Sequence, residues 1–107
     1  MAHFKPVIIT TTAPNLDEAR RIGAALLEKG LAACVQYESI TSHYCWQGEA
    51  VCEDEIRITI KSARCHYKKV EKTILRLHSY ECPQVLMQPV HRGFTPYLVW
   101  AKAALGL

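Results

Sequence analysis

Residues 32–61 read AACVQYESITSHYCWQGEAVCEDEIRITIK, and this stretch decides the fold. Aromatic, β-branched and small residues dominate as far as Trp46, and Gln47-Gly48 then marks a reversal of the chain. In the returning half, isoleucines at positions 56, 58 and 60 alternate with polar residues, which is the period of a strand with one buried face. The stretch therefore predicts a long β-hairpin.

The predicted hairpin is too long for a globule of this size. Strands of about 13 residues at about 3.3 Å per residue reach roughly 43 Å, whereas a compact chain of this length is only about 34 Å across. The tip, Tyr44-Cys45-Trp46, should therefore overhang the body, and it is aromatic. Because exposed aromatic groups and unpaired strand edges favour association, we expect a partner subunit to cover the tip and the chain to form a homo-oligomer.

On the N-terminal side of the hairpin, the sequence predicts a strand followed by a helix. Residues 7–12 are rich in β-branched side chains, which favour a buried strand. Asn15 and Glu18 have capping-box spacing with Asn15 in the cap position, and apolar residues then repeat at helical spacing up to Gly30. We therefore expect an amphipathic helix over residues 15–29.

On the C-terminal side, the sequence predicts a second helix, a short strand and a closing helix. Apolar residues at helical spacing place the second helix at about 65–78, with one face toward a sheet. Residues 85–87 give the strand, and Thr95-Pro96 supplies a cap and a first-turn proline for the closing helix. The order β-α-β-β-α-β-α predicts one α+β domain over residues 1–107, a ferredoxin-like sandwich with a long hairpin and a C-terminal helix.

Composition excludes several classes of function. The net charge of the chain is only +3, and the basic residues are interleaved with acidic ones, so we expect no nucleic-acid partner. No apolar stretch is long enough to span a membrane and no signal peptide is evident, which favours the cytoplasm. The five cysteines are odd in number and form no C-x-x-C, so we expect packed thiols, with Cys34 in the core, rather than disulfides or a zinc knuckle.

The segment 77–85, LHSYECPQV, links the second helix to the last strand and gathers chemically active side chains. The end of the helix accounts for His78, which the helix dipole would favour as an imidazolium, and for Pro83. It does not account for Tyr80 and Glu81, for which we expect a hydrogen-bonded network at a subunit interface. The alternative is that His78, Tyr80 and Glu81 line an intersubunit cleft with Trp46 and bind a small anion or a metal.

Four motifs together carry a resemblance to a known family: LAACV at 31–35, ITSHYCWQGE at 40–49, HSYECP at 78–83, and the segment from Pro89-Val90 to Trp100. They closely resemble the CutA family, the divalent-cation tolerance proteins, over essentially the whole chain. The resemblance implies a cytoplasmic homotrimer of ferredoxin-like subunits, similar in assembly to the PII signalling proteins, and a role in tolerance to divalent cations such as copper.

The resemblance also implies a copper site that this chain retains only in part. In related bacterial proteins the ligands include a cysteine on the first strand and two adjacent histidines, at positions that match Thr11, Leu77 and His78 here. Only His78 is a metal ligand, so a soft site would need other donors. The candidate metal ligands are His78, Cys45 and Cys82, with core packing as the alternative for the two thiols. The candidate interface or cleft residues are Trp46, Tyr80, Glu81, Tyr44 and Trp100.

The sequence therefore predicts a trimeric binding or signalling protein without catalytic activity. Its ligand is not named by the sequence, although a divalent cation or copper is the candidate. Two alternatives stay open: a PII-like trimer that signals through a small ligand or partner protein with no direct metal role, and an enzyme of unknown type. This sequence lacks the motif that each of three other classes requires: an RNA-recognition domain, a copper chaperone with paired cysteines and an acylphosphatase-like hydrolase.

Overall fold

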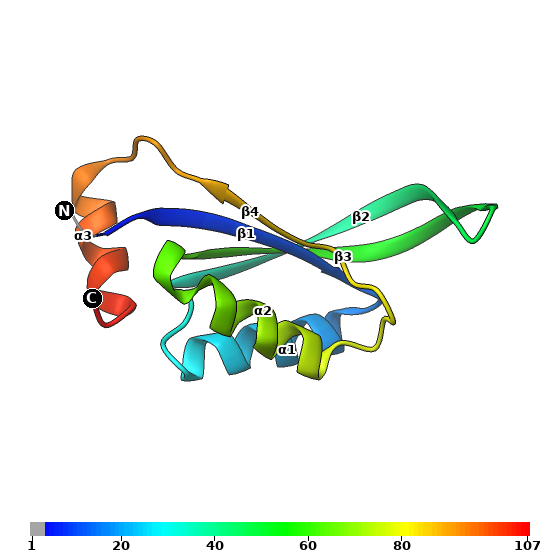
Figure 1. Ribbon diagram of the computed structural model, residues 1–107, viewed down its shortest axis with the longest axis horizontal. Coiled ribbons are helices and arrows are strands. Elements are labelled where there is room, and N and C mark those ends of the chain that lie inside the picture. The colour runs from blue at the N-terminus through cyan, green and yellow to red at the C-terminus, as the bar shows by residue number, and fades with distance from the viewer. Residues whose placement is uncertain (1–3) are drawn as a thin grey trace.

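A four-stranded antiparallel sheet carries the fold of residues 4–107, the part of the chain that the computed structural model describes. Its spatial order is β2-β3-β1-β4, and the strands are β1 (Pro6–Ala13), β2 (Cys34–Trp46), β3 (Glu49–Ala63) and β4 (Val85–Pro89). Figure 1 shows two helices on one side of this sheet and a third helix at its end. The helices are α1 (Leu16–Glu28), α2 (Tyr67–Leu77), which a 3-10 turn (Arg64–His66) precedes, and α3 (Thr95–Ala104).

The observed order confirms the predicted ferredoxin-like α+β fold with its C-terminal helix. Between the sheet and the two helices lies a core of fully buried side chains, among them Ile9, Ile58 and Ile60 from the strands and Ile22 and Ile74 from the helices. Each such side chain contributes roughly 1.5–3 kcal/mol when it leaves water. This core fixes the inner part of the sheet and both helices as one unit.

A second, smaller apolar cluster holds α3 at the end of the sheet. It contains Phe4, Ala33, Ala63, Ala101 and Leu105, with Leu98 packed against it. Only one side of α3 is used in this way, because Ala101 is its single buried residue among those described. The rest of the helix surface is left exposed.

The hairpin of β2 and β3 extends beyond the rest of the molecule, as predicted. Strand β1 ends where Ala13 pairs with Ile56, so residues 49–55 of β3 pair only with β2. The longest dimension of the molecule is 46 Å, against 25 and 22 Å for the other two, and Figure 1 shows the hairpin reaching away from the helices along this axis. Gln47 and Gly48 both have positive φ, at 51° and 81°, which is the type I′ turn that suits a two-residue hairpin loop.

The helix ends confirm one predicted cap and correct two others. Asn15 caps α1, since its side chain accepts a hydrogen bond from the backbone N–H of Glu18 at 2.9 Å. Glu18 does not complete a capping box, because its carboxylate bonds to Ser79 instead. Thr95 is the first residue of α3 and not its cap, which is Phe94 with no side-chain hydrogen bond.

The cysteines are less buried than the sequence predicted. Cys34 is half-buried at the start of β2 and lies outside both core clusters, whereas Cys45, Cys52, Cys65 and Cys82 are exposed. The expectation of a core thiol at position 34, and of packed thiols at 45 and 82, was therefore wrong. For Cys45, Cys52 and Cys82 the reason is their position, because the hairpin beyond β1 and the segment after α2 have no core to enter.

Among the described residues, none of the helices combines the length and the apolar character needed to cross a bilayer.

Candidate functional site

The α2–β4 connection, residues 78–84, is anchored through a buried histidine. The His78 side chain has no exposed surface, and its Nε2 lies 2.6 Å from the carbonyl oxygen of Thr12 at the end of β1. Its Nδ1 accepts the backbone N–H of Tyr80 at 3.1 Å. A carbonyl oxygen can only accept and a backbone N–H can only donate, so Nε2 serves as the donor to Thr12 and Nδ1 as the acceptor for Tyr80. His78 thus anchors the connection just past the end of α2.

Glu18 of α1 holds the next residue of the connection. Glu18 is 4% exposed, and its Oε2 accepts two hydrogen bonds from Ser79, one from the backbone N–H at 3.1 Å and one from the hydroxyl at 3.0 Å. The same oxygen lies 3.4 Å from His78 Nδ1. The first turn of α1, the end of β1 and the connection therefore form one hydrogen-bonded unit.

Tyr80 joins this unit to the overhanging half of β3. Its hydroxyl donates to Glu55 Oε2 at 2.6 Å, and its ring lies 4.7 Å from that of His78. Burial, followed by the hydrogen bond to Glu55, raises the pKa of Tyr80 far above its usual value, because an ionised phenol beside a carboxylate would be repelled. Tyr80 is therefore a neutral donor. The predicted network exists for Tyr80, but its carboxylate is Glu55.

Glu81 takes no part in this network within the described chain, and its place in an interface network stays a prediction. It is exposed and makes no side-chain hydrogen bond within residues 4–107. Glu81 instead lines a cleft where the α2–β4 connection passes beside the hairpin.

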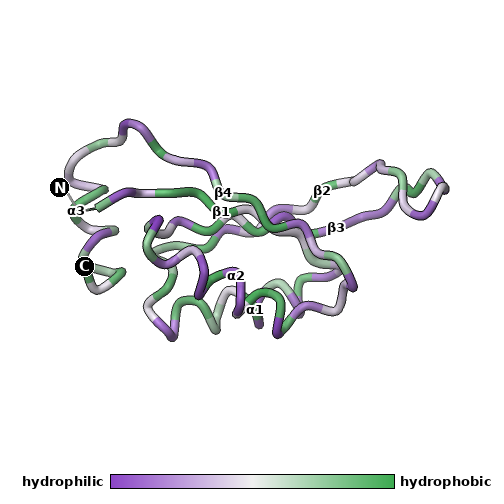
Figure 2. Tube along the Cα trace, in the orientation of Figure 1, coloured by the Kyte–Doolittle hydropathy of each residue, from purple (hydrophilic) through white to green (hydrophobic). Residues whose placement is uncertain are grey.

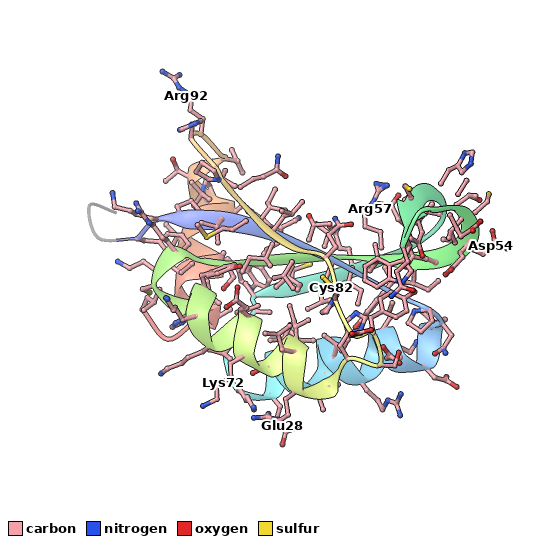
Figure 3. All side chains as sticks on the ribbon, turned by 45° about the vertical axis from the view of Figure 1, so that its right-hand side comes forward. Glu28, Asp54, Arg57, Lys72, Cys82 and Arg92 are labelled. Carbon is pink, nitrogen blue, oxygen red and sulfur yellow. The ribbon has the colours of Figure 1, made fainter. Side chains whose placement is uncertain are left out.

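The cleft has a volume of about 730 Å³ and is open on one side. Its strand-borne walls come mostly from one face of the hairpin, since Ser42, Tyr44 and Trp46 alternate along β2 and the paired register places Glu53 and Glu55 on the same face of β3. The full lining is Thr12, Ser42, His43, Tyr44, Trp46, Glu53, Glu55, Ser79, Tyr80, Glu81, Cys82 and Gln84. In Figure 3, Cys82 marks the connection and Asp54 marks the hairpin on the other side of this region.

The cleft is acidic. Glu53, Glu55 and Glu81 contribute three carboxylates, and the Tyr44 hydroxyl donates to Glu53 Oε1 at 3.1 Å. No lysine or arginine lines it among the described residues. The potential in such a cleft attracts cations and repels anions. Within one chain this lining therefore favours a cation, and the alternative in which an intersubunit cleft binds a small anion stays a prediction.

The three predicted metal ligands do not come together within one chain. Both nitrogens of His78 are used, and Cys45 is not among the residues that line the cleft with Cys82. Across residues 4–107 no group of three His, Cys, Asp or Glu side chains is arranged to hold a metal ion. Thr11, which matches the family's cysteine ligand, is fully buried with no partner for its Oγ1 in this part of the chain.

The predicted interface residues divide between the two ends of the molecule. Tyr44, Trp46, Tyr80 and Glu81 line the cleft beside the hairpin. Trp100 lies on α3, half-exposed, with its ring 5.6 Å from that of Tyr97. Figure 1 shows α3 at the opposite end of the long axis from the hairpin tip. Contact of either group with another subunit stays a prediction.

Sequence reasoning missed the glutamates that shape the site. Glu55 is 6% exposed although it sits in an acidic run, and Glu18 is the buried acceptor for Ser79. The period-2 pattern of β3 could have placed Glu53 and Glu55 on one face, because Ile56, Ile58 and Ile60 define the other. No local pattern could have shown that the α2–β4 connection would pass beside them.

Comparisons with known proteins agree on one family. A family model described as CutA1 divalent ion tolerance protein matches residues 7–104. The divalent-cation tolerance protein CutA of Thermus thermophilus is 34% identical over 100 residues, covering 92% of this chain and 97% of the relative. The corresponding protein of Archaeoglobus fulgidus is 37% identical over 92 residues, which cover 86% of this chain and 90% of the relative.

Solved structures share the fold closely. The structure described as the periplasmic divalent cation tolerance protein CutA from Archaeoglobus fulgidus has a TM-score of 0.91 at 34% identity, covering 94% of this chain and 98% of that one. CutA1 from Shewanella sp. SIB1, described as a stable protein from a psychrotrophic bacterium, has a TM-score of 0.89 at 37% identity, covering 92% and 94%. The fold matches, the similarity covers nearly the whole chain, and the motifs of the hairpin and the connection agree. This chain therefore belongs to the CutA family of divalent-cation tolerance proteins.

Proposed function

We propose that this chain acts as a non-catalytic, homotrimeric binding protein in divalent-cation tolerance, with the acidic cleft as its ligand site. The observation that carries the proposal is the placement of Glu53, Glu55 and Glu81 around one cleft with no lining lysine or arginine in residues 4–107. Positive ligands are favoured there by the local potential.

The side chains of the cleft favour binding over catalysis. Tyr80 is held neutral by its raised pKa, and the hydroxyls of Tyr44 and Tyr80 are both donated to carboxylates. Within residues 4–107, no hydrogen bond joins a lining hydroxyl or thiol to the lining histidine, His43. A nucleophile activated by an adjacent base would need such a bond.

Two exposed apolar surfaces at opposite ends of the molecule support a closed ring of subunits. Phe94, the cap of α3, is 76% exposed and Trp100 of the helix is 51% exposed, while at the hairpin tip Trp46 is 42% exposed. Figure 2 shows apolar stretches at both ends of the long axis. A head-to-tail contact joins two different surfaces and closes into a ring when the rotation permits. A homotrimer built in this way covers both surfaces and the unpaired edges of β2 and β4.

The free thiols support the cytoplasm as the compartment of this protein. All five cysteines are free, and four of them are exposed. Exposed thiols persist where glutathione and thioredoxin keep them reduced.

The test combines light scattering with calorimetric titration of the reduced protein. A particle mass of three chains, unchanged on dilution, is expected, together with saturable binding of a positively charged ligand. A monomer mass contradicts the trimer. A trimer that binds no cation at all supports the second candidate, a signalling trimer with no direct metal role, which the lack of a three-ligand group in residues 4–107 favours.

A further inference from the structure

The walls of the cleft combine negative charge with aromatic surface. Tyr44 and Trp46 come from β2 and Tyr80 from the α2–β4 connection, and all three line the same cleft as Glu53, Glu55 and Glu81. Aromatic faces attract cations through their quadrupole, most strongly when the cation is partly removed from water. Carboxylates add hydrogen-bond acceptors for any cation that carries N–H groups.

Glu55 is the most informative of the carboxylates. It is 6% exposed, yet no lysine, arginine or histidine pairs with it among residues 4–107, and its one hydrogen-bond donor there is Tyr80 at Oε2. A buried carboxylate without a cationic partner is costly, since charges removed from water are ordinarily paired. The Oε1 atom has no partner in the described chain, so it can accept from a ligand in the cleft that Glu55 lines.

The geometry does not suit a bare metal ion. A metal bound by protein side chains needs several ligand atoms at about 2.0–2.6 Å from one point. The described residues hold no group of three His, Cys, Asp or Glu side chains with that arrangement. A cleft of about 730 Å³ with three aromatic side chains is instead of the size and character of a site for an organic molecule.

We propose that the cleft binds an aliphatic amine cation of the diamine or polyamine class. Its ammonium groups donate hydrogen bonds to Glu55 Oε1 and to Glu53, and its methylene chain lies along Tyr44. N–H donors distinguish this class from quaternary ammonium ions, which cannot bond to the carboxylates. The proposal rests on the proposed function of the cleft as the ligand site and names the class of ligand that it takes.

The test is calorimetric titration of the intact protein with 1,4-diaminobutane at low salt and pH 8. One diamine per chain should bind, and 1,4-butanediol, which has the same length without charge, should not bind. Glu53→Gln should weaken binding at least about tenfold, because it removes a charge-assisted hydrogen bond. Glu28→Gln makes the same change of charge on the exposed end of α1, which Figure 3 shows on the helical side, and should leave affinity unchanged.

Three results would overturn the amine proposal. The first is a verified trimer that does not bind the diamine, which leaves the proposed assembly intact. The second is equal weakening by Glu53→Gln and Glu28→Gln, which shows attraction to net charge alone. The third is tighter binding of magnesium chloride than of the diamine, with the same dependence on Glu53. Light scattering on the same samples reports the trimer separately, so a monomeric mass counts against the proposed function.

Discussion

The two halves of β3 have different surroundings and different roles. Residues 56–63 pair with β1 on one side and β2 on the other, and they carry the buried isoleucines of the core. Residues 49–55 pair with β2 alone and carry Glu53 and Glu55 of the cleft. The same strand thus stabilises the fold where the sheet is complete and forms a site where the sheet has ended. Substitutions in the two halves should separate stability from binding.

The largest effect is expected in the inner half. Ile60→Ala removes a fully buried side chain and leaves a cavity, which should lower the free energy of unfolding by about 2–5 kcal/mol. Val51→Ala, in the outer half, should cost much less because Val51 is only half-buried. Urea denaturation of both variants measures the difference. Equal losses would show that the two halves are not distinct in stability.

The next effect concerns assembly at the hairpin tip. Trp46→Ala should weaken the trimer by about 2–4 kcal/mol, since buried aromatic anchors dominate interface energies. Leu27→Ala removes a similarly exposed apolar side chain from α1, away from both ends, and serves as the control. Sedimentation on dilution reports the dissociation. A tip that plays no part in assembly would leave both variants alike.

A smaller loss is expected at the junction between the connection and the outer half of β3. Tyr80→Phe removes the donor to Glu55 and should lower stability by about 1–3 kcal/mol, because the carboxylate is left unpaired. Glu81→Gln should have little effect, since Glu81 is exposed and has no hydrogen bond in the described chain. Thermal melting of the two variants shows whether Tyr80 alone stabilises this junction or whether Tyr80 and Glu81 both do, as the sequence suggested.

Alkaline pH provides a second measure of the same junction. The folded-state pKa of Tyr80 is raised above the ordinary value of about 10. Above that pH the unfolded chain loses the phenolic proton while the folded chain keeps it, so stability is fully present below pH 10 and falls as pH rises beyond it. Tyr80→Phe should make this fall less steep. Tyr97→Phe, which removes a tyrosine that donates to no carboxylate within residues 4–107, should leave the slope unchanged.

The smallest effect is expected for the thiols. Because Cys45 does not line the cleft that Cys82 lines, each should contribute independently to Cu(I) affinity, and the double Cys→Ser change should equal the sum of the single changes. His78→Ala should lower stability without loss of Cu(I) affinity, since both ring nitrogens are already bonded. Titration under anaerobic, reducing conditions checks both statements. A strong coupling of the two cysteines would indicate a shared ion.

The difference between the predicted and the observed site follows from which interactions are local. Asn15, Gly30 and Gln47-Gly48 act within a few residues of their own position, and the structure confirms the cap, the end of α1 and the turn that they predict. His78 was assigned as a ligand from the family resemblance, and Cys82 from its residue type. Their partners lie far away in the sequence, or are absent from the described residues, and no pattern near them gives that information.

The sequence by itself determined the order of the elements, the ferredoxin-like sheet and the overhang of the hairpin, because periodicity, turn residues and strand length are properties of adjacent residues. Only the tertiary structure decided the use of the polar side chains. Long-range packing brought Thr12 to His78, Glu18 to Ser79 and Glu55 to Tyr80, which turned a suspected ligand into a buried support. It also placed the acidic face of β3 beside the α2–β4 connection, since β1 ends at Ala13 and leaves that edge of the hairpin free.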